Sequence, residues 1–291
     1  MPREPVEQTF NATGARLAYF EWGETGASRV VLLIHATGFH ARCWDETIRA
    51  WPESWRVIAV DLRGHGSSEK TGPMPDWTVP AHDIGELVAH LNLTAAIGAG
   101  HSMGGHILVQ VAAARPRTFA RLALIDPVMM APEIYAMPSP WREDAEHPVA
   151  RRRNSWASWQ EMFDAFKARH PYSLWRPRVL EDYCRYGLLP KANGEGFELA
   201  CPPAIEASIY TGSTGTDVYA LARAIEVPVL VVRAKQRDPN AARDFTDFAA
   251  SPTWEGVAGV FPHGRDLYLP RLTHFIPMQE PELTAKFVAG D

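Results

Sequence analysis

Residues 100–105, Gly-His-Ser-Met-Gly-Gly, follow a short apolar run and begin a run of small and apolar residues with helical spacing. Glycine two positions before and two positions after Ser102 gives the steric clearance that a tight turn from strand to helix needs. Such a turn exposes the serine hydroxyl beside the first N–H groups of the helix, which have no partner within it. We therefore interpret Ser102 as a nucleophile, in preference to a serine that only caps a helix.

The segments on both sides of this turn alternate between short β-rich runs and helical patterns. Several of these runs are continuously apolar, which is typical of parallel strands buried on both faces of a sheet. Strands are expected at residues 16–22, 30–34, 56–60, 95–99, 121–125, 227–233 and 266–269, and helices at 44–51, 104–114 and 281–288. The alternation predicts the α/β class, with a mostly parallel, doubly wound sheet covered by helices on both faces.

The alternation stops between residues 128 and 216, where no convincing strand pattern is found and aromatic residues are frequent. Helical patterns at 156–167 and 178–186 predict an insertion that is helical. We expect residues 1–127 and 217–291 to form the core domain, and residues 128–216 to form a helical cap, or lid.

Composition limits the classes of protein to which this chain can belong. Its 291 residues are 46% hydrophobic and 22% charged, as in soluble globular proteins, and the net charge of −5 disfavours a nucleic-acid-binding surface. No apolar run approaches the ~18 residues that span a bilayer, and the N-terminus lacks the apolar stretch of a signal peptide. We expect a cytoplasmic protein that neither inserts into membranes nor binds nucleic acid, and a homodimer is left open.

The sequence carries no clear motif for a cofactor or a metal. No Gly-x-Gly-x-x-Gly follows a strand pattern, and no His, Asp or Glu cluster has metal-ligand spacing. The cysteines, Cys43, Cys184 and Cys201, are odd in number and unclustered, so they indicate neither a disulfide framework nor a zinc site. We therefore expect no cofactor and no metal.

A nucleophilic serine needs a general base, and histidine is the usual one near neutral pH. His274 lies after the last predicted strand and before the terminal helix, where a parallel α/β fold collects reactive groups. It also follows the serine in the chain, as the base does in hydrolases whose catalytic groups occur in the order serine, acid, histidine. His101 is too close to Ser102 in sequence to serve well, and we expect it to pack beside the turn.

A carboxylate must hold the imidazole in the correct tautomer. Two aspartates follow predicted strands, Asp238 and Asp126, and each also suits a turn ahead of a proline. Asp238 is favoured by its order and position, and Asp126 stays open as the alternative.

A tetrahedral intermediate also needs two donors for its oxyanion. We predict the backbone N–H groups of Met103, at the turn, and of Thr37, in the loop after an early buried strand. Phe39 and Trp44 are expected to line the substrate pocket together with Trp141 and Trp159 of the insertion.

These segments together resemble the α/β-hydrolase superfamily. The resemblance rests on His35-Ala36-Thr37-Gly38, Asp61-Leu62-Arg63-Gly64-His65-Gly66-Ser67-Ser68, Gly100 to Gly105, Asp238 and Thr273-His274-Phe275-Ile276-Pro277, which occur in family order over nearly the whole chain. It implies the hydrolase fold, with residues 128–216 similar to the family's cap. Two positions depart from the pattern: Ala36 and Ala234 stand where the family usually has glycine.

The pattern favours a serine hydrolase of the esterase or lipase type. It would cleave a carboxylic ester or lactone with an apolar or aromatic acyl group through Ser102, His274 and Asp238. Cleavage of a carbon–carbon bond in a β-diketone-like substrate, or peracid formation with peroxide, would use the same residues. A ligand receptor without hydrolytic activity is a third hypothesis, because fold does not dictate function.

Overall fold

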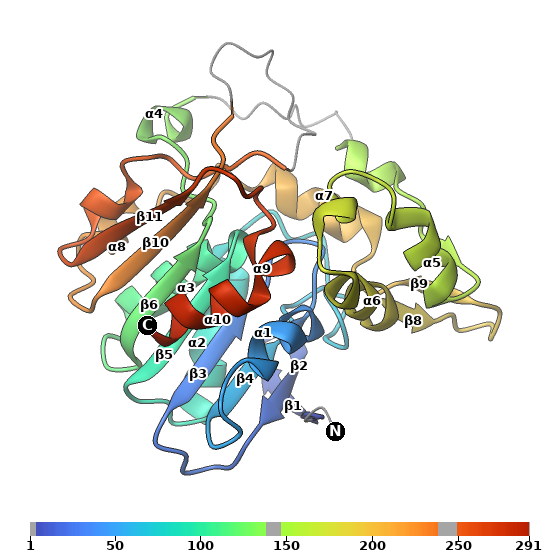
Figure 1. Cartoon of the computed structure of the whole chain (residues 1–291), viewed down its shortest axis with the longest axis horizontal. Coiled ribbons are helices and arrows are strands. Elements are labelled where there is room, and N and C mark those ends of the chain that lie inside the picture. Colours follow the sequence, from blue (N-terminus) through green and yellow to red (C-terminus); the bar gives the residue numbers. More distant parts are fainter. Residues whose placement is uncertain (1–3, 138–146, 238–248, 291) are drawn as a thin grey trace.

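A sheet of eight strands forms the centre of the computed structural model, which describes residues 4–137, 147–237 and 249–290. The strands are ordered β1-β2-β4-β3-β5-β6-β10-β11, antiparallel from β1 to β4 and parallel from β4 to β11 (Figure 1). Their bounds are β1 Val6–Ala12, β2 Ala15–Trp22, β3 Val30–Ile34, β4 Arg56–Val60, β5 Ala96–His101, β6 Phe119–Ile125, β10 Val229–Ala234 and β11 Gly264–Leu269.

Helices cover both faces of this sheet, so the predicted doubly wound architecture is confirmed. α2 (Thr78–His90), α3 (Met103–Ala114) and α8 (Tyr219–Ala222) share one apolar core, and α1 (Asp45–Arg49) and α10 (Pro281–Ala289) share the other. Successive side chains of a strand point to opposite faces, so Leu32 belongs to the first core and Val31 to the second. Among the residues that the structure describes, no helix is long and apolar enough to span a membrane.

Much of the β6–β10 segment, the chain between these two strands, forms a group of short elements beside the core (Figure 1). The group contains α5 (Trp159–Phe166), α6 (Pro177–Tyr186) and α7 (Pro203–Thr211), with 3₁₀ turns at Pro148–Arg151 and Tyr172–Leu174, whereas α4 (Pro132–Tyr135) lies apart from it on the side of β10 and β11. A small antiparallel sheet of β7 (Ser155–Trp156), β9 (Phe197–Leu199) and β8 (Leu188–Pro190) lies among them. The expectation that no strand occurs here is wrong, because strands this short show no alternation in the sequence.

β1 and α2 are among the other elements that the sequence did not predict. β1 is exposed along most of its length, so it lacks the apolar alternation that marks a half-buried strand. α2 contains Pro80 and Gly85, which interrupt a helical pattern. By contrast, the continuously apolar runs Val30–Ile34 and Arg56–Val60 form β3 and β4 as predicted.

Candidate active site

Ser102 occupies the turn between β5 and α3 in a backbone conformation that serine rarely adopts. Its φ and ψ are 57° and −119°, and only 6% of its surface is exposed. A Cβ at Gly100 would collide with the carbonyl of Gly104, and a Cβ at Gly104 would collide with that of Ile34. The glycines of the motif are therefore needed for close backbone approach, and the strain falls on the residue with the reactive side chain.

Ser102, His274 and Asp126 form a continuous chain of hydrogen bonds. The Ser102 hydroxyl donates to Nε2 of His274 at 2.9 Å, and Nδ1–H of His274 donates to Oδ2 of Asp126 at 2.6 Å. All three are buried, and Asp126 is fully so. This is the arrangement in which an imidazole can take a proton from a serine while a carboxylate fixes its tautomer.

The position of Asp126 follows from the order of the strands. It comes directly after β6, which lies between β5 and β10, so it adjoins both strand ends. Its Oδ1 accepts hydrogen bonds from the backbone N–H of Ala234 at 2.9 Å and from the hydroxyls of Ser251 at 2.6 Å and Thr253 at 3.3 Å. These donors compensate the burial of a charged carboxylate.

Of the two candidate acids, the structure brings Asp126 beside His274. Oδ2 of Asp126 occupies the place beside Nδ1 of His274 that the sequence analysis assigned to Asp238. Asp238 itself lies outside the described residues. Both aspartates satisfy the chain order of nucleophile, acid and base, and only the sheet topology shows that β6 ends beside the serine.

The loop that carries His274 is held by its own backbone. The N–H of His274 donates to the carbonyl of Ala249 at 2.8 Å, and its carbonyl accepts a hydrogen bond from Nε2 of His101 at 2.8 Å. His101 packs beside the turn as predicted. Burial lowers its pKa well below the usual range, so His101 is neutral near pH 7 and acts as a hydrogen-bond donor.

The loop after β3 lies against the turn that carries Ser102. The Thr37 hydroxyl donates to Sδ of Met103 at 3.5 Å, and the N–H of Gly38 donates to Nε2 of His65 at 3.0 Å. Met103 is the first residue of α3, where N–H groups have no partner within the helix. The assignment of the Thr37 and Met103 N–H groups to an oxyanion hole stays a prediction.

The predicted pocket residues fall into different surroundings. Phe39 lies in an aromatic cluster with Trp175, Tyr183 and Phe275, at ring-centroid distances of 5.2 to 6.1 Å. Trp159 is partly buried against the same cluster. Trp44 is fully buried in the core that α1 and α10 share, and we do not propose it as a binding residue. Trp141 lies outside the described residues.

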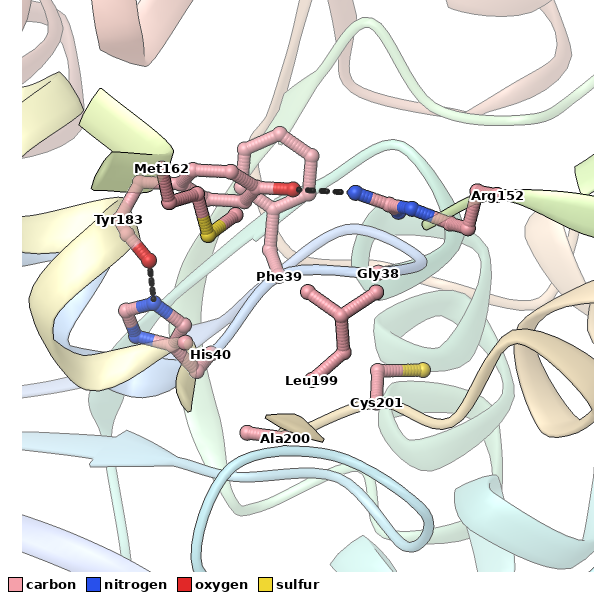
Figure 2. Close-up of a pocket in the computed structure, with 10 residues that line it drawn as sticks. Gly38, Phe39, His40, Arg152, Met162, Tyr183, Leu199, Ala200 and Cys201 are labelled. Carbon is pink, nitrogen blue, oxygen red and sulfur yellow. Dashed lines mark hydrogen bonds between the residues drawn. The ribbon is translucent and has the colours of Figure 1, made fainter. Parts of the chain in front are cut away.

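A small cavity lies between the loop after β3 and the β6–β10 segment (Figure 2). Its volume of about 10 Å³ is enough for roughly one water molecule. Arg152 and Tyr183 line it beside Gly38 and Phe39, and Nη2 of Arg152 donates to the Tyr183 hydroxyl at 3.2 Å. Sequence reasoning missed Arg152, because the run 151–153 looks like a solvated basic stretch.

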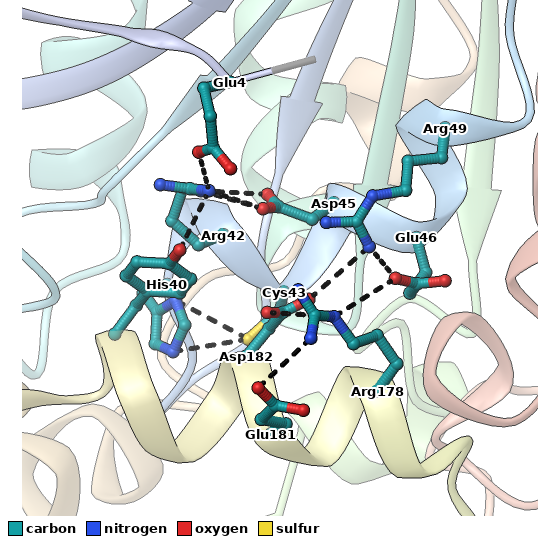
Figure 3. Close-up of polar contacts among 11 residues, drawn as sticks. Glu4, His40, Arg42, Cys43, Asp45, Glu46, Arg49, Arg178, Glu181 and Asp182 are labelled. Carbon is teal, nitrogen blue, oxygen red and sulfur yellow. Dashed lines mark hydrogen bonds and ion pairs between the residues drawn. The ribbon is translucent and has the colours of Figure 1, made fainter. Parts of the chain in front are cut away.

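A charged cluster joins α6 to the core on the side of α1 (Figure 3). The Arg42 guanidinium holds Asp45 through Nε and Nη2 at 2.7 to 3.0 Å and donates to the Tyr186 hydroxyl at 3.2 Å. Asp182 of α6 faces Arg49 at 4.0 Å and is 2% exposed. Burial raises the pKa of Asp182 to about 7.

One group of possible metal ligands occurs among the described residues, contrary to the sequence analysis. His82, Asp83 and Glu86 of α2 bring ligand atoms within 4.8 Å of one another. Asp83 is already paired with Arg63, and Glu86 accepts hydrogen bonds from Thr13. The carboxylates therefore have partners, and we propose no metal site here.

One large class of hydrolases has this combination of fold and site. In that class a strained serine follows a strand near the middle of an α/β sheet, and hydrogen bonds link it to a histidine and an acid. The model of the alpha/beta hydrolase family matches residues 31–287, and the chain belongs to this family.

Individual relatives are more distant. Lipase LipV of Mycobacterium tuberculosis is 37% identical over 37% of this chain and 40% of its own length. The (E)-2-((N-methylformamido)methylene)succinate hydrolase of Acinetobacter baylyi is 32% identical over 42% of this chain and 46% of its own. The chain thus spans less than half the length of these curated relatives. The crystal structure of an E-2-(acetamidomethylene)succinate hydrolase superimposes with a TM-score of 0.75 at 20% identity, over 98% of both chains, and so shows the fold alone.

Proposed function

We propose that this protein is a serine hydrolase that cleaves a carboxylic ester or lactone through an acyl-enzyme. The observation that carries the proposal is the hydrogen-bonded chain from Ser102 through His274 to Asp126, at 2.9 and 2.6 Å. A receptor would have no need for a strained serine with its proton directed at a buried imidazole.

In the first half-reaction Ser102 Oγ attacks the carbonyl carbon while Nε2 of His274 takes the hydroxyl proton. Asp126 stabilises the imidazolium, and the N–H groups of Met103 and Thr37 hold the oxyanion. The C–O bond to the leaving group then breaks, and His274 returns the proton to the leaving alcohol. In the second half-reaction water attacks the acyl-enzyme, its proton passes to His274 and then to Ser102, and the acid is released.

Serine labelling combined with ester turnover tests this proposal. Ser102→Ala should lose labelling by a fluorophosphonate, and its turnover of a short p-nitrophenyl ester should fall by several powers of ten. Ser173→Ala removes an exposed hydroxyl and serves as the matched control. Labelling and turnover of Ser102→Ala at the wild-type rate would reject the mechanism.

A second substrate class is supported by the names of the relatives. One relative in sequence and one in structure are named as hydrolases of amidomethylene-substituted succinates. An amide that carries carboxylates therefore belongs in the substrate panel beside esters and lactones. A β-diketone and peroxide in the same panel test the carbon–carbon and peracid alternatives.

A further inference from the structure

The loop after β3 is held from the core side by two histidines that have no part in the proposed proton transfers. Nε2 of His65 accepts the N–H of Gly38 at 3.0 Å, and Nδ1–H of His65 donates to the carbonyl of Arg63 at 3.0 Å. His35 joins the same loop to Leu62, whose N–H donates to its Nε2 at 3.0 Å. Burial lowers the pKa of His65 to about 4, so the ring is a neutral acceptor at pH 7.

The other side of the loop carries a carboxylate from α7. Gly38 has a φ of +77°, and a Cβ there would lie 2.5 Å from Oε1 and 2.9 Å from Cδ of Glu206. Glu206 is only 4% exposed. Its carboxylate therefore lies against the backbone next to Thr37, the residue whose N–H is proposed to bind the oxyanion.

Arg152 neutralises this carboxylate. Its Nη1 donates to Oε2 of Glu206 at 2.6 Å, and its Nη2 donates to the hydroxyl of Tyr183, whose ring packs on Phe39 at 5.2 Å (Figure 2). The Arg152 guanidinium thus binds both Glu206 and Tyr183, the two residues that pack on the loop after β3.

Charge decides what this contact does during catalysis. An unpaired carboxylate beside Gly38 would oppose the negative charge that develops on the oxyanion, and the low polarity of a buried site would strengthen that repulsion. The other titratable side chains that interact with Glu206 are Tyr172, Tyr183, Tyr210 and Cys201, whose pKa values burial raises, so they are neutral near pH 7. Lys70 lies near Cys201 and donates to the carbonyl of His65 at 3.3 Å. Among the described residues, Arg152 is the cation bonded to this carboxylate.

We propose that Arg152 is a positioning residue, which acts through Glu206 to hold the loop after β3 and to cancel the carboxylate's charge beside the oxyanion. This inference rests on the proposed function. Through these two residues the β6–β10 segment would influence the rate of the reaction, in addition to any contact that the segment makes with substrate.

Near-isosteric variants separate the charge from the packing. In Arg152→Met the buried carboxylate loses its cation, and kcat at pH 8.5 should fall by about tenfold or more with a smaller change in KM. Glu206→Gln removes the opposing charge and keeps an amide oxygen that can accept from Arg152, so its loss of kcat should be clearly smaller than that of Arg152→Met. The double variant Arg152→Met/Glu206→Gln should recover most of the activity lost in Arg152→Met, a rescue that a purely structural ion pair does not predict.

The pH profile gives a second readout with a definite sign. Burial already raises the pKa of Glu206, and Arg152 opposes that rise. Without the guanidinium the pKa rises further, so Glu206 in Arg152→Met is neutral at low pH and becomes charged as the pH increases. The ratio of wild-type to Arg152→Met kcat should therefore grow with pH over the range in which Glu206 ionises in the variant. Glu206→Gln should abolish this dependence.

Arg153→Ala is the matched control, since this neighbour forms an exposed ion pair with Glu161. Equal losses of kcat in Arg152→Met and Glu206→Gln, or a ratio that is flat with pH, would overturn the inference. So would a rise in KM confined to carboxylate-bearing substrates with kcat unchanged, because Arg152 would then bind substrate directly. Loss of fluorophosphonate labelling in Ser102→Ala is measured with Arg152 and Glu206 intact, so the proposed function stands or falls separately.

Discussion

Asp126→Asn should disable the enzyme while leaving its fold intact. In the variant Oδ1 of the amide still accepts hydrogen bonds from Ala234 and Ser251, but an amide N–H faces Nδ1 of His274. The imidazole then changes tautomer, so its Nε2 carries a proton and cannot accept the one on Ser102.

The size of the loss follows from the same contact. Two unit charges about 4 Å apart interact by about 4 kcal/mol at an effective dielectric constant near 20, which is about three powers of ten in rate. With the wrong tautomer added, we expect kcat for a p-nitrophenyl ester to fall by up to about 10⁴. The melting temperature, followed by circular dichroism, should change by only a few degrees.

Asp238→Asn is the comparison that makes this result informative. If Asp126 is the acid, Asp238→Asn should stay within a few fold of wild type. Wild-type turnover in Asp126→Asn beside a crippled Asp238→Asn would refute the assignment, although Ser102 and His274 would keep their roles.

Two further predictions concern the β6–β10 segment. Trp159 is partly buried, so Trp159→Ala should change the ranking of acyl chain lengths in an ester panel and keep activity on the shortest ester. Trp175 is only 5% exposed, so Trp175→Ala should chiefly lower the free energy of unfolding, by about 3–5 kcal/mol in denaturant. Asp182→Asn should flatten the pH dependence of stability. A carboxyl whose pKa is raised to about 7 stabilises the fold below pH 4 and loses that contribution as the pH rises through 7. At pH 8 thermal unfolding should therefore show the variant to be more stable than the wild type by roughly 1–3 kcal/mol.

Ser102 and His274, the proposed nucleophile and base, could be placed from the sequence because their signals are local. Ser102 is marked by glycines whose Cβ atoms would collide with backbone only a few residues or one strand away. His274 lies between β11 and α10, which correspond to the predicted last strand and terminal helix, although the short α9 (Ile276–Gln279) between them was not predicted. β3 and β4 were predictable because they are buried along their length and so read as continuous apolar runs.

The contacts of Asp126 and Arg152, on which their proposed roles rest, could not be predicted in this way, because they depend on which segments become neighbours. Asp126 reaches His274 since β6 lies beside β5, and 148 residues separate the two in sequence. Arg152 lies in a run of three arginines. It differs from Arg153 in that it contacts the buried Glu206, 54 residues away, whereas Arg153 pairs with the exposed Glu161. The order of strands in a sheet and the packing of an insertion against it are long-range properties, which the spacing of residues along the sequence does not predict.

The contacts of the loop after β3 lead us to expect that changes in substrate specificity also change the rate. His65 fixes it from the core, while Glu206 and Tyr183 cover it from the β6–β10 segment. A change in that segment which enlarges the pocket also alters the charge and packing on Gly38, next to the proposed oxyanion donor. Exchange of residues 147–212 for those of a relative should therefore lower kcat even on substrates that both proteins accept. The loss should be avoided where the exchanged segment keeps an arginine and a glutamate that pair as Arg152 and Glu206 do.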